Sequence, residues 1–185
     1  LFSLAGKTAL ITGSSRGLGY AIAQGYAAAG ARVILNGIDT GRLADSATSL
    51  RVQGFDIVES AFNVANEEEI VAAFKSLDAQ GVNVDIVVNN AGIQFRKPIV
   101  ELARADWQRV LDTNLTGAFL VAREAASRMI ARGSGGKFIN IGSLMSAAGR
   151  ATVAPYTAAK GGIKMLTHTM VAEWAIHNIQ ANAIG

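Results

Sequence analysis

Two residues near the end of the chain have types and spacing suited to proton transfer. Tyr156 and Lys160 are four positions apart in a stretch that Pro155 could open as a helix, so both side chains would leave one helix face. A phenol in water releases its proton only near pH ~10, and a neighbouring ammonium favours the phenolate. The pair could therefore serve as a general acid and base. Alone, such a pair is more often a half-buried aromatic residue beside a lysine that reaches solvent.

A glycine-rich stretch near the start of the chain has the composition of an anion-binding loop. The apolar run Thr8–Thr12 is followed by Gly13, Gly17 and Gly19 and then by the alanine-rich stretch Ala21–Ala29, which predicts a strand, a tight loop and a helix. The unpaired N–H groups and positive dipole at a helix start attract an anion such as a pyrophosphate. The G-x-x-x-G-x-G spacing departs from G-x-G-x-x-G, and the alternative is a plain strand-to-helix turn.

Two further polar residues could take part in the same chemistry. Ser143, at the end of a predicted strand, could hydrogen-bond a substrate oxygen beside the phenol. Asn114, within a long predicted helix, could hold a water molecule that links the lysine to solvent. The simpler interpretations are a turn residue for Ser143, a helix residue bonded to its own backbone for Asn114, and a polar turn for the Asn89-Asn90 pair.

The elements that must position these residues alternate regularly along the chain. Strands are expected at Lys7–Thr12, Arg32–Asn36, Asp56–Phe62, Val84–Asn89, Lys137–Gly142 and Ile179–Ile184. Helices are expected at Gly17–Ala29, Gly41–Gln53, Glu67–Gln80, Asp106–Arg132 and Pro155–His177. The alternation predicts an α/β fold, a Rossmann-type doubly wound parallel sheet with helices on both faces. Ligand chemistry is expected at the carboxyl ends of the strands, where the motifs fall.

Composition limits the classes of function. The 185 residues, half of them hydrophobic, predict a single domain over residues 1–185. A net charge of +3 without a basic block argues against partners that are nucleic acids or membrane surfaces. The absence of cysteine and the presence of only His168 and His177 argue against a metal site. Without a long apolar run or a leader, the protein is expected to be soluble and cytoplasmic.

Taken together, the motifs resemble the short-chain dehydrogenase/reductase family over nearly the whole chain. The matching residues are Thr12-Gly13-x-x-x-Gly17-x-Gly19, Asn89-Asn90-Ala91-Gly92, Asn114, Ser143 and Tyr156-x-x-x-Lys160. The resemblance implies a Rossmann fold, a nicotinamide cofactor, and hydride transfer between that cofactor and a carbinol or carbonyl carbon. It also implies that Tyr156 is the acid-base, that Lys160 favours the phenolate and holds the nicotinamide ribose, that Ser143 orients the substrate, and that Asn114 completes a proton relay.

The same resemblance implies a cofactor site, with two departures from the family pattern. Its expected residues are Gly13, Ser15, Arg16, Gly17, Leu18, Gly19, Gly37, Ile38, Asn63, Val64, Asn90, Ala91, Gly92, Tyr156 and Lys160. Asn63-Val64 stands where the family usually has an aspartate near the adenine, although an amide can also accept a hydrogen bond. Gly37-Ile38 stands where an acidic residue would bind the ribose of NAD, so no carboxylate is expected there to repel a 2′-phosphate. With Arg16, and Arg42 as a weaker second candidate, able to pair with a 2′-phosphate, NADP is preferred and NAD is the alternative.

Several stretches are similar to the gluconate 5-dehydrogenases of this family, among them Leu1–Lys7, Phe62–Val64, Met165–Thr167 and His177–Gln180. The similarity implies reversible oxidation of D-gluconate to 5-dehydro-D-gluconate. Arg96 and Arg150 are candidates to bind the carboxylate of this sugar acid. Gln94 and Ser146 are candidate polar neighbours of its hydroxyl groups, and Ser143 is expected to contact the substrate as well. The alternative within the family is a 3-oxoacyl-thioester reductase, which would need a more apolar cleft.

Members of the family normally continue beyond the position that matches Gly185, through a helical segment that covers the substrate and a further strand. We therefore expect this C-terminal strand and lid to be missing from the 185 residues. If the protein really ends at Gly185, the alternative from a different class of function is a non-catalytic nucleotide-binding fragment or scaffold, whose uncovered sixth-strand edge would be prone to association. If it continues, the resemblance implies a homotetramer or homodimer.

Overall fold

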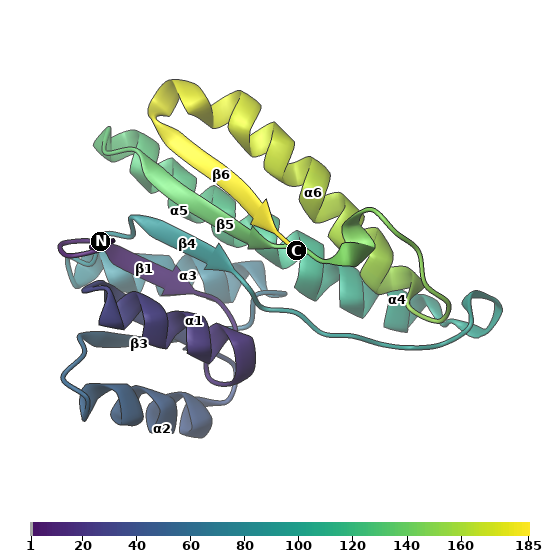
Figure 1. Ribbon diagram of the computed structural model, residues 1–185, viewed down its shortest axis with the longest axis horizontal. Helices are drawn as coiled ribbons and strands as arrows, with labels where there is room; N and C mark the ends of the chain where they lie inside the picture. The colour runs from purple at the N-terminus through teal and green to yellow at the C-terminus, as the bar shows by residue number, and fades with distance from the viewer. Residues whose placement is uncertain (1) are drawn as a thin grey trace.

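The computed structural model describes residues 2–185 and contains one six-stranded, entirely parallel sheet (Figure 1). The strands are ordered β3-β2-β1-β4-β5-β6 across the sheet, which confirms the predicted doubly wound topology. Their bounds are β1 Thr8–Ile11, β2 Arg32–Gly37, β3 Ile57–Ala61, β4 Ile86–Asn89, β5 Gly136–Ile141 and β6 Ile179–Ile184. Each strand lies close to its predicted range.

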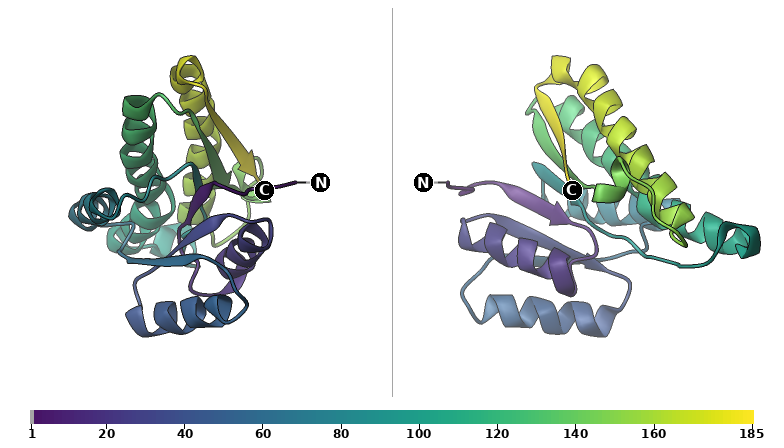
Figure 2. Two further views of the ribbon diagram at one scale, coloured as in Figure 1. Left: turned by 90° about the vertical axis from the view of Figure 1, so that its left-hand side faces the viewer. Right: turned by 45° about the vertical axis from the view of Figure 1, so that its right-hand side comes forward.

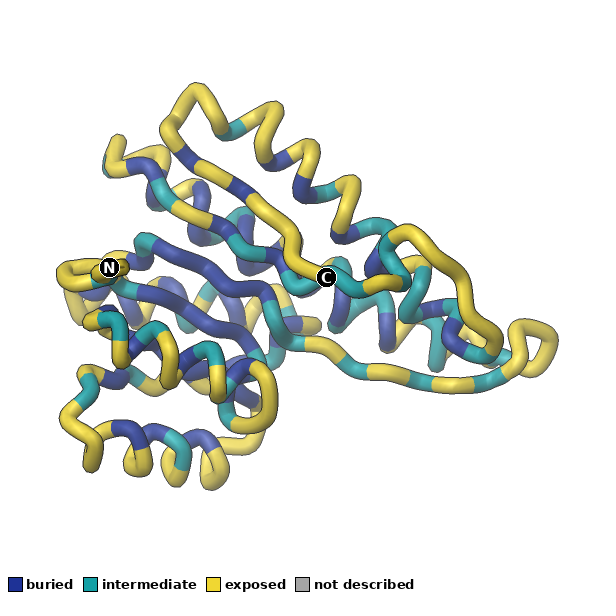
Figure 3. Tube along the Cα trace, viewed as in Figure 1, coloured by how far each residue is buried: buried dark blue, intermediate teal, exposed yellow. Residues whose placement is uncertain are grey.

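Helices cover both faces of the sheet (Figure 2). They are α1 Gly17–Ala28, α2 Thr40–Arg51, α3 Glu67–Ala79, α4 Arg104–Leu111, α5 Gly117–Arg132 and α6 Ala154–Trp174. Because successive strand residues point to opposite faces, Leu10 and Val87 share a core with α3, α5 and α6, while Ala9 and Val88 share a second core with α1 and α2. Buried residues accordingly line the central strands and the helix faces toward the sheet (Figure 3).

The predicted helix Asp106–Arg132 is wrong in its middle. It begins earlier, at Arg104, and a π-helical turn at Asp112–Thr116 separates α4 from α5. The prediction missed this turn because an inserted residue in a helix leaves no break in composition. The helix predicted to end at His177 changes to a 3-10 turn at Ala175–His177, and short 3-10 turns also occur at Ile99–Glu101 and Leu144–Ser146.

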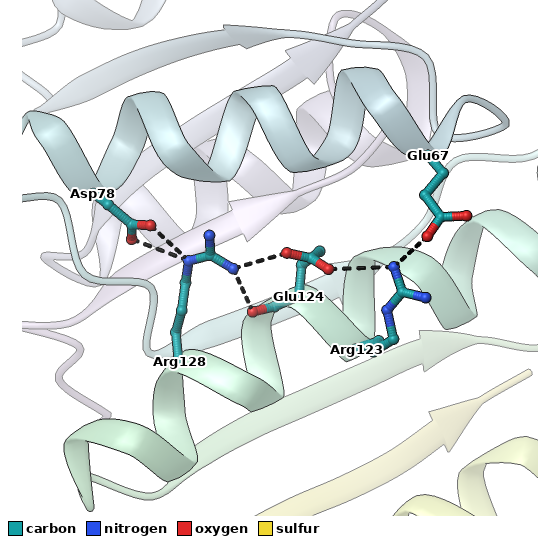
Figure 4. A network of polar contacts seen from close by, with 5 residues as sticks. All are labelled: Glu67, Asp78, Arg123, Glu124 and Arg128. Carbon is teal, nitrogen blue, oxygen red and sulfur yellow. Dashed lines mark hydrogen bonds and ion pairs between the residues drawn. The ribbon is translucent and has the colours of Figure 1, made fainter.

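A network of ion pairs joins α3 to α5 (Figure 4). Arg128 contacts Asp78 at 2.9 Å and Glu124 at 3.0 Å, and Arg123 contacts Glu67 at 2.6 Å. The Arg128 guanidinium also lies 5.0 Å from the centroid of the Phe74 ring. These contacts hold the two helices side by side on the same face of the sheet. Among the described residues, no helix combines the length and hydropathy needed to cross a membrane.

Candidate active site

The loop between β1 and α1 packs directly against the segment that follows β4. Gly13 and Gly17 have φ values of +63° and +60°, in the left-handed region that favours glycine. A Cβ on Gly13 would lie 2.9 Å from the Cα of Ala91, and one on Gly19 would collide with the Gly13 carbonyl oxygen and the Asn90 side chain. Glycine at 13 and 19 is therefore required by close contact, and the glycine-rich stretch forms the predicted tight loop.

Two buried polar residues, Asn36 and Thr12, hold this loop in shape. Neither was predicted as a cofactor-binding residue. Asn36 accepts from the backbone N–H of Gly13 at 3.1 Å and donates to the carbonyl of Phe62 at 3.0 Å, so it joins the loop to β3. Thr12 Oγ1 accepts from the backbone N–H groups of Asn90 and Ala91, both at 3.0 Å. Asn36 could have been noticed in the sequence, because an amide at the end of an apolar strand is expected to be buried and must then find hydrogen-bond partners.

The start of α1 has backbone donors that no side chain satisfies. Arg16 occupies the N-cap position but its side chain makes no capping hydrogen bond, and the first turn contains no acidic residue. The first N–H groups of a helix without a cap, combined with its positive dipole, form a site for an anion. The glycine contacts and this helix start fit a pyrophosphate-bearing cofactor, because they let a ligand reach the backbone.

A cavity of about 940 Å³ opens at this edge of the sheet. Thirteen of the fifteen predicted cofactor residues line it, namely Gly13, Ser15, Arg16, Gly17, Leu18, Gly19, Gly37, Ile38, Asn63, Val64, Asn90, Ala91 and Gly92. The other two, Tyr156 and Lys160, are not among its lining residues. A further wall was not predicted, and it is formed by Ala105, Gln108, Arg109, Asp112 and Thr113. These residues come from α4 and the π-helical turn, so only the folded chain brings them to the cavity.

The end of β2 also differs from the prediction that no carboxylate stands there. Gly37 and Ile38 are followed by Asp39, which lines the cavity. Asp39 Oδ1 accepts from the backbone N–H of Arg42 at 3.0 Å and caps α2, while its Oδ2 lies 3.0 Å from Arg42 Nη2. The carboxylate is therefore paired with Arg42, the second candidate for a 2′-phosphate.

Asn63 lies at the cavity wall with its side-chain oxygen already in use. Its Oδ1 accepts from the backbone N–H of Ala65 at 3.0 Å, and its own backbone N–H donates to Glu69 Oε2 at 2.7 Å. An amide oxygen has two lone pairs, so Asn63 retains the capacity to accept a second hydrogen bond. Asn66 caps α3 by accepting from the backbone N–H of Glu69 at 3.2 Å.

Tyr156 and Lys160 share one face of α6, as predicted. Lys160 Nζ lies 5.6 Å from the centroid of the Tyr156 ring and donates to the carbonyl of Ile141, the last residue of β5. Lys160 is only 5% exposed, and this burial lowers its pKa below the ordinary value of 10.5. The lysine therefore bonds α6 to the strand that leads to Ser143.

Ser143 follows β5 and caps the 3-10 turn Leu144–Ser146. Its Oγ accepts from the backbone N–H of Met145 at 3.2 Å, and Ser146 Oγ accepts from the backbone N–H of Ser143 at 3.2 Å. Ser143 is thus a turn residue, as in the simpler interpretation. Because the cap uses only a lone pair of Ser143, its hydroxyl proton remains free to be donated to a ligand oxygen.

Asn114 lies in the π-helical turn and is buried. Its Oδ1 accepts from the backbone N–H of Ile93 at 2.7 Å, and its Nδ2 donates to the carbonyl of Ile93 at 2.8 Å. The simpler interpretation, a bond to its own helix backbone, is therefore wrong. Asn114 fixes the segment that leaves the cavity toward the exposed residues Gln94 and Arg96.

The predicted substrate residues Gln94, Arg96 and Arg150 are exposed and lie outside the cavity. The segments that carry them nevertheless run side by side (Figures 1 and 2), because the backbone N–H of Lys97 donates to the carbonyl of Thr152 at 2.9 Å. Thr152 has a φ of +70°, a strained value for a β-branched residue. The strained residue immediately precedes Val153, at the start of α6.

Comparisons with known proteins agree with this architecture. The family model described as short chain dehydrogenase matches residues 7–185. The chain is 45% identical to 2-dehydro-3-deoxy-D-gluconate 5-dehydrogenase from Formosa agariphila, covering 100% of this chain and 70% of that protein. It is 44% identical to 5-keto-D-gluconate 5-reductase from Escherichia coli K12, covering 100% and 72%.

A solved structure gives the same result in three dimensions. The crystal structure of a gluconate 5-dehydrogenase from Burkholderia cenocepacia J2315, in complex with NADP and tartrate, superposes with a TM-score of 0.95. The sequences are 44% identical, and the match covers 98% of this chain and 71% of that one. The family match extends over the glycine loop, the strand order and the Tyr156–Lys160 helix. The chain therefore belongs to the short-chain dehydrogenase/reductase family.

Proposed function

We propose that this protein is an NADP-preferring dehydrogenase that reversibly oxidises D-gluconate to 5-dehydro-D-gluconate. The observation that carries the proposal is the placement of Tyr156 and Lys160 on a helix whose lysine is bonded to Ile141, two residues before Ser143. This arrangement supports a proton donor, a nearby positive charge and a hydroxyl group at one edge of the sheet. The named relatives act on, or are named for, sugar acids.

The cofactor would occupy the cavity at the glycine loop. The unsatisfied N–H groups at the start of α1 would bind its pyrophosphate, and Arg16 would pair with a 2′-phosphate. Asn90, Ala91 and Gly92 would support the middle of the cofactor. The gluconate 5-dehydrogenase from Burkholderia cenocepacia is described with NADP, which supports the same preference here. When bound, the nicotinamide supplies or accepts the hydride.

The residues of this chain would manage the proton. Tyr156 would take the carbinol proton during oxidation and return it during reduction. The buried ammonium of Lys160 would favour the phenolate and hold the nicotinamide ribose. Ser143, whose hydroxyl proton is free, would donate to the same substrate oxygen and orient it. Asn114 would complete a relay through water.

Substrate recognition would depend on the two segments joined by the Lys97–Thr152 backbone hydrogen bond. Arg96 and Arg150 lie on these segments and would bind the carboxylate, while Gln94 would contact a hydroxyl group. A second substrate, 2-dehydro-3-deoxy-D-gluconate, is favoured by the 45% identity to the dehydrogenase from Formosa agariphila. Both substrates are sugar acids oxidised at carbon 5. We further infer a single domain that acts as a cytoplasmic homotetramer or homodimer.

An absorbance assay of the purified protein tests the proposal. NADPH consumption is measured with 5-dehydro-D-gluconate and with an acetoacetyl thioester, and NADP⁺ reduction is measured with D-gluconate and with 2-dehydro-3-deoxy-D-gluconate. We expect turnover with the sugar acids. Turnover of the thioester alone would favour the 3-oxoacyl-thioester reductase instead, and cofactor binding without any turnover would favour the non-catalytic alternative.

A further inference from the structure

A chain of buried hydrogen bonds joins the end of β4 to α6 through β5. Asn89 Nδ2 donates to Asn140 Oδ1 at 2.8 Å, and Asn140 Nδ2 donates to Thr167 Oγ1 at 2.9 Å. All three residues are buried, and Asn140 is completely inaccessible. Burying an amide costs free energy unless its polar atoms are bonded, so these three side chains depend on one another.

One hydroxyl group sets the direction of every bond in this chain. Thr167 has a single hydroxyl proton, which it donates to the carbonyl of Ile163 at 2.8 Å. Its oxygen can then only accept from Asn140, so Asn140 must turn its amino group toward α6 and its carbonyl oxygen toward β4. Asn89 must in turn present its amino group to Asn140, and its own Oδ1 has no partner among the described residues.

This series of buried hydrogen bonds lies beside the residues proposed to carry out the reaction. Lys160 and Thr167 are seven residues apart on α6, about two helical turns, so they leave the same face. Lys160 bonds to Ile141 and Thr167 bonds to Asn140, the preceding residue of β5. The helix is therefore attached to the strand at two points. Two attachments about two turns apart oppose a tilt of the helix relative to the strand that a single attachment would allow.

We propose that Asn140 and Thr167 are positioning residues, which hold α6 in the orientation that presents Tyr156 beside the end of β5. The kinetic part of this inference rests on the proposed function. Loss of the Thr167 hydroxyl would leave the Asn140 amino group with only Met170 Sδ at 3.5 Å, a weak acceptor. The Asn140 side chain would then be free to turn over, and the Lys160–Ile141 bond would be the one strong hydrogen bond left of these contacts between α6 and β5.

The kinetic test compares three substitutions on the same helix. Thr167→Val removes the hydroxyl while keeping the shape, Thr167→Ser keeps the hydroxyl, and Thr169→Val is the matched control. Thr169 is exposed, and its hydroxyl bonds only to its own helix, at the carbonyl of Met165. In T167V we expect kcat for D-gluconate oxidation to fall about ten- to a hundredfold, because a small misplacement of a catalytic group is costly. T167S and T169V should retain wild-type kcat.

The KM for the cofactor separates positioning from a general loss of structure. The KM for NADP⁺ should rise much less than kcat falls in T167V, because Thr167 does not line the cofactor cavity and Thr12 still holds Asn90 and Ala91. A fall in kcat with little change in the KM for NADP⁺ would indicate that α6 is misplaced rather than that the fold is lost. Wild-type kcat in T167V, or equal impairment in T167S, would overturn the inference.

Hydrogen exchange measured by mass spectrometry tests the attachment without any substrate. We expect faster exchange over residues 154–163 in T167V than in wild type, T167S or T169V. Unchanged exchange in T167V would overturn the inference even if every variant is active. If the wild-type protein oxidises none of the sugar acids, the proposed function fails, and the exchange comparison still decides whether the chain of bonds holds α6.

Discussion

The ammonium of Lys160 lies 5.6 Å from the centroid of the Tyr156 ring, on the same face of α6. Its bond to the carbonyl of Ile141 keeps this charge between the helix and β5. A buried charge is screened less by solvent and salt than an exposed one. The roles of Tyr156 and Lys160 can therefore be tested separately by substitution.

Replacing Tyr156 by phenylalanine should remove turnover and leave cofactor binding nearly intact. A general acid and base contributes about a hundred- to ten-thousandfold to rate, and kcat should fall by at least this factor. Because Tyr156 does not line the cavity, the affinity for NADPH should stay close to that of wild type. An absorbance assay and a fluorescence titration measure the two quantities. Retained turnover would show that another group donates the proton.

Replacing Lys160 by methionine should abolish turnover without lowering stability at neutral pH. Burial lowers the pKa of Lys160, so the unfolded chain binds this proton more tightly than the folded one. The lysine thus destabilises the fold below its lowered pKa, and this cost disappears as the pH rises toward the ordinary value of 10.5. The advantage of K160M should shrink over that range. Urea midpoints at neutral and alkaline pH measure it, and a less stable K160M at neutral pH would contradict the prediction.

Replacing Arg16 by glutamine should weaken NADPH binding selectively. A hydrogen bond between a guanidinium and a phosphate is worth about 1.5–3 kcal/mol, so the Kd for NADPH should rise about tenfold or more. NADH lacks the 2′-phosphate and serves as the internal control, with an unchanged Kd. Parallel fluorescence titrations provide both values. Equal weakening of the two cofactors would mean that Arg16 shapes the loop and does not bind the phosphate.

Replacing Asp39 by asparagine should increase the preference for NADPH. Asparagine caps a helix about as well as aspartate, so the bond to the backbone N–H of Arg42 should persist. The substitution removes a negative charge from the cavity wall and releases the Arg42 guanidinium. We expect the Kd for NADPH to fall about three- to tenfold through one new charged contact. Asp56→Asn, which breaks the ion pair with Arg32 outside the cavity, is the matched control. It should change neither the Kd for NADPH nor the Kd for NADH.

Replacing Arg128 by methionine should destabilise the fold through the contacts between α3 and α5. Arg128 bonds to Asp78 and Glu124 and lies over the Phe74 ring, with its side chain only 24% exposed. Because this partly buried network outweighs a single surface pair, the loss should be about 1–2 kcal/mol. Arg32→Met breaks one exposed pair and should cost less than about 0.5 kcal/mol. Urea denaturation measures both, and equal costs would show that the network adds nothing.

Much of this architecture was predictable because it depends on short-range patterns. Apolar runs separated by amphipathic stretches specified the parallel sheet, and Gly13, Gly17 and Gly19 marked the loop where side chains do not fit. The Tyr156–Lys160 spacing specified a shared helix face, since helical geometry alone places such residues together. All of these predictions needed only neighbours along the chain.

Tertiary structure decided what depends on contacts between distant residues. Asp39 was overlooked because its pairing with Arg42 and its place on the cavity wall emerge only when α2 packs beside the loop. The π-helical turn is held by Asn114 against Ile93, 21 residues away, and Asn140 meets Thr167 across 27 residues. A sequence states which donors and acceptors exist, but the burial that makes each of them require a particular partner arises only when the sheet and its helices close on one another.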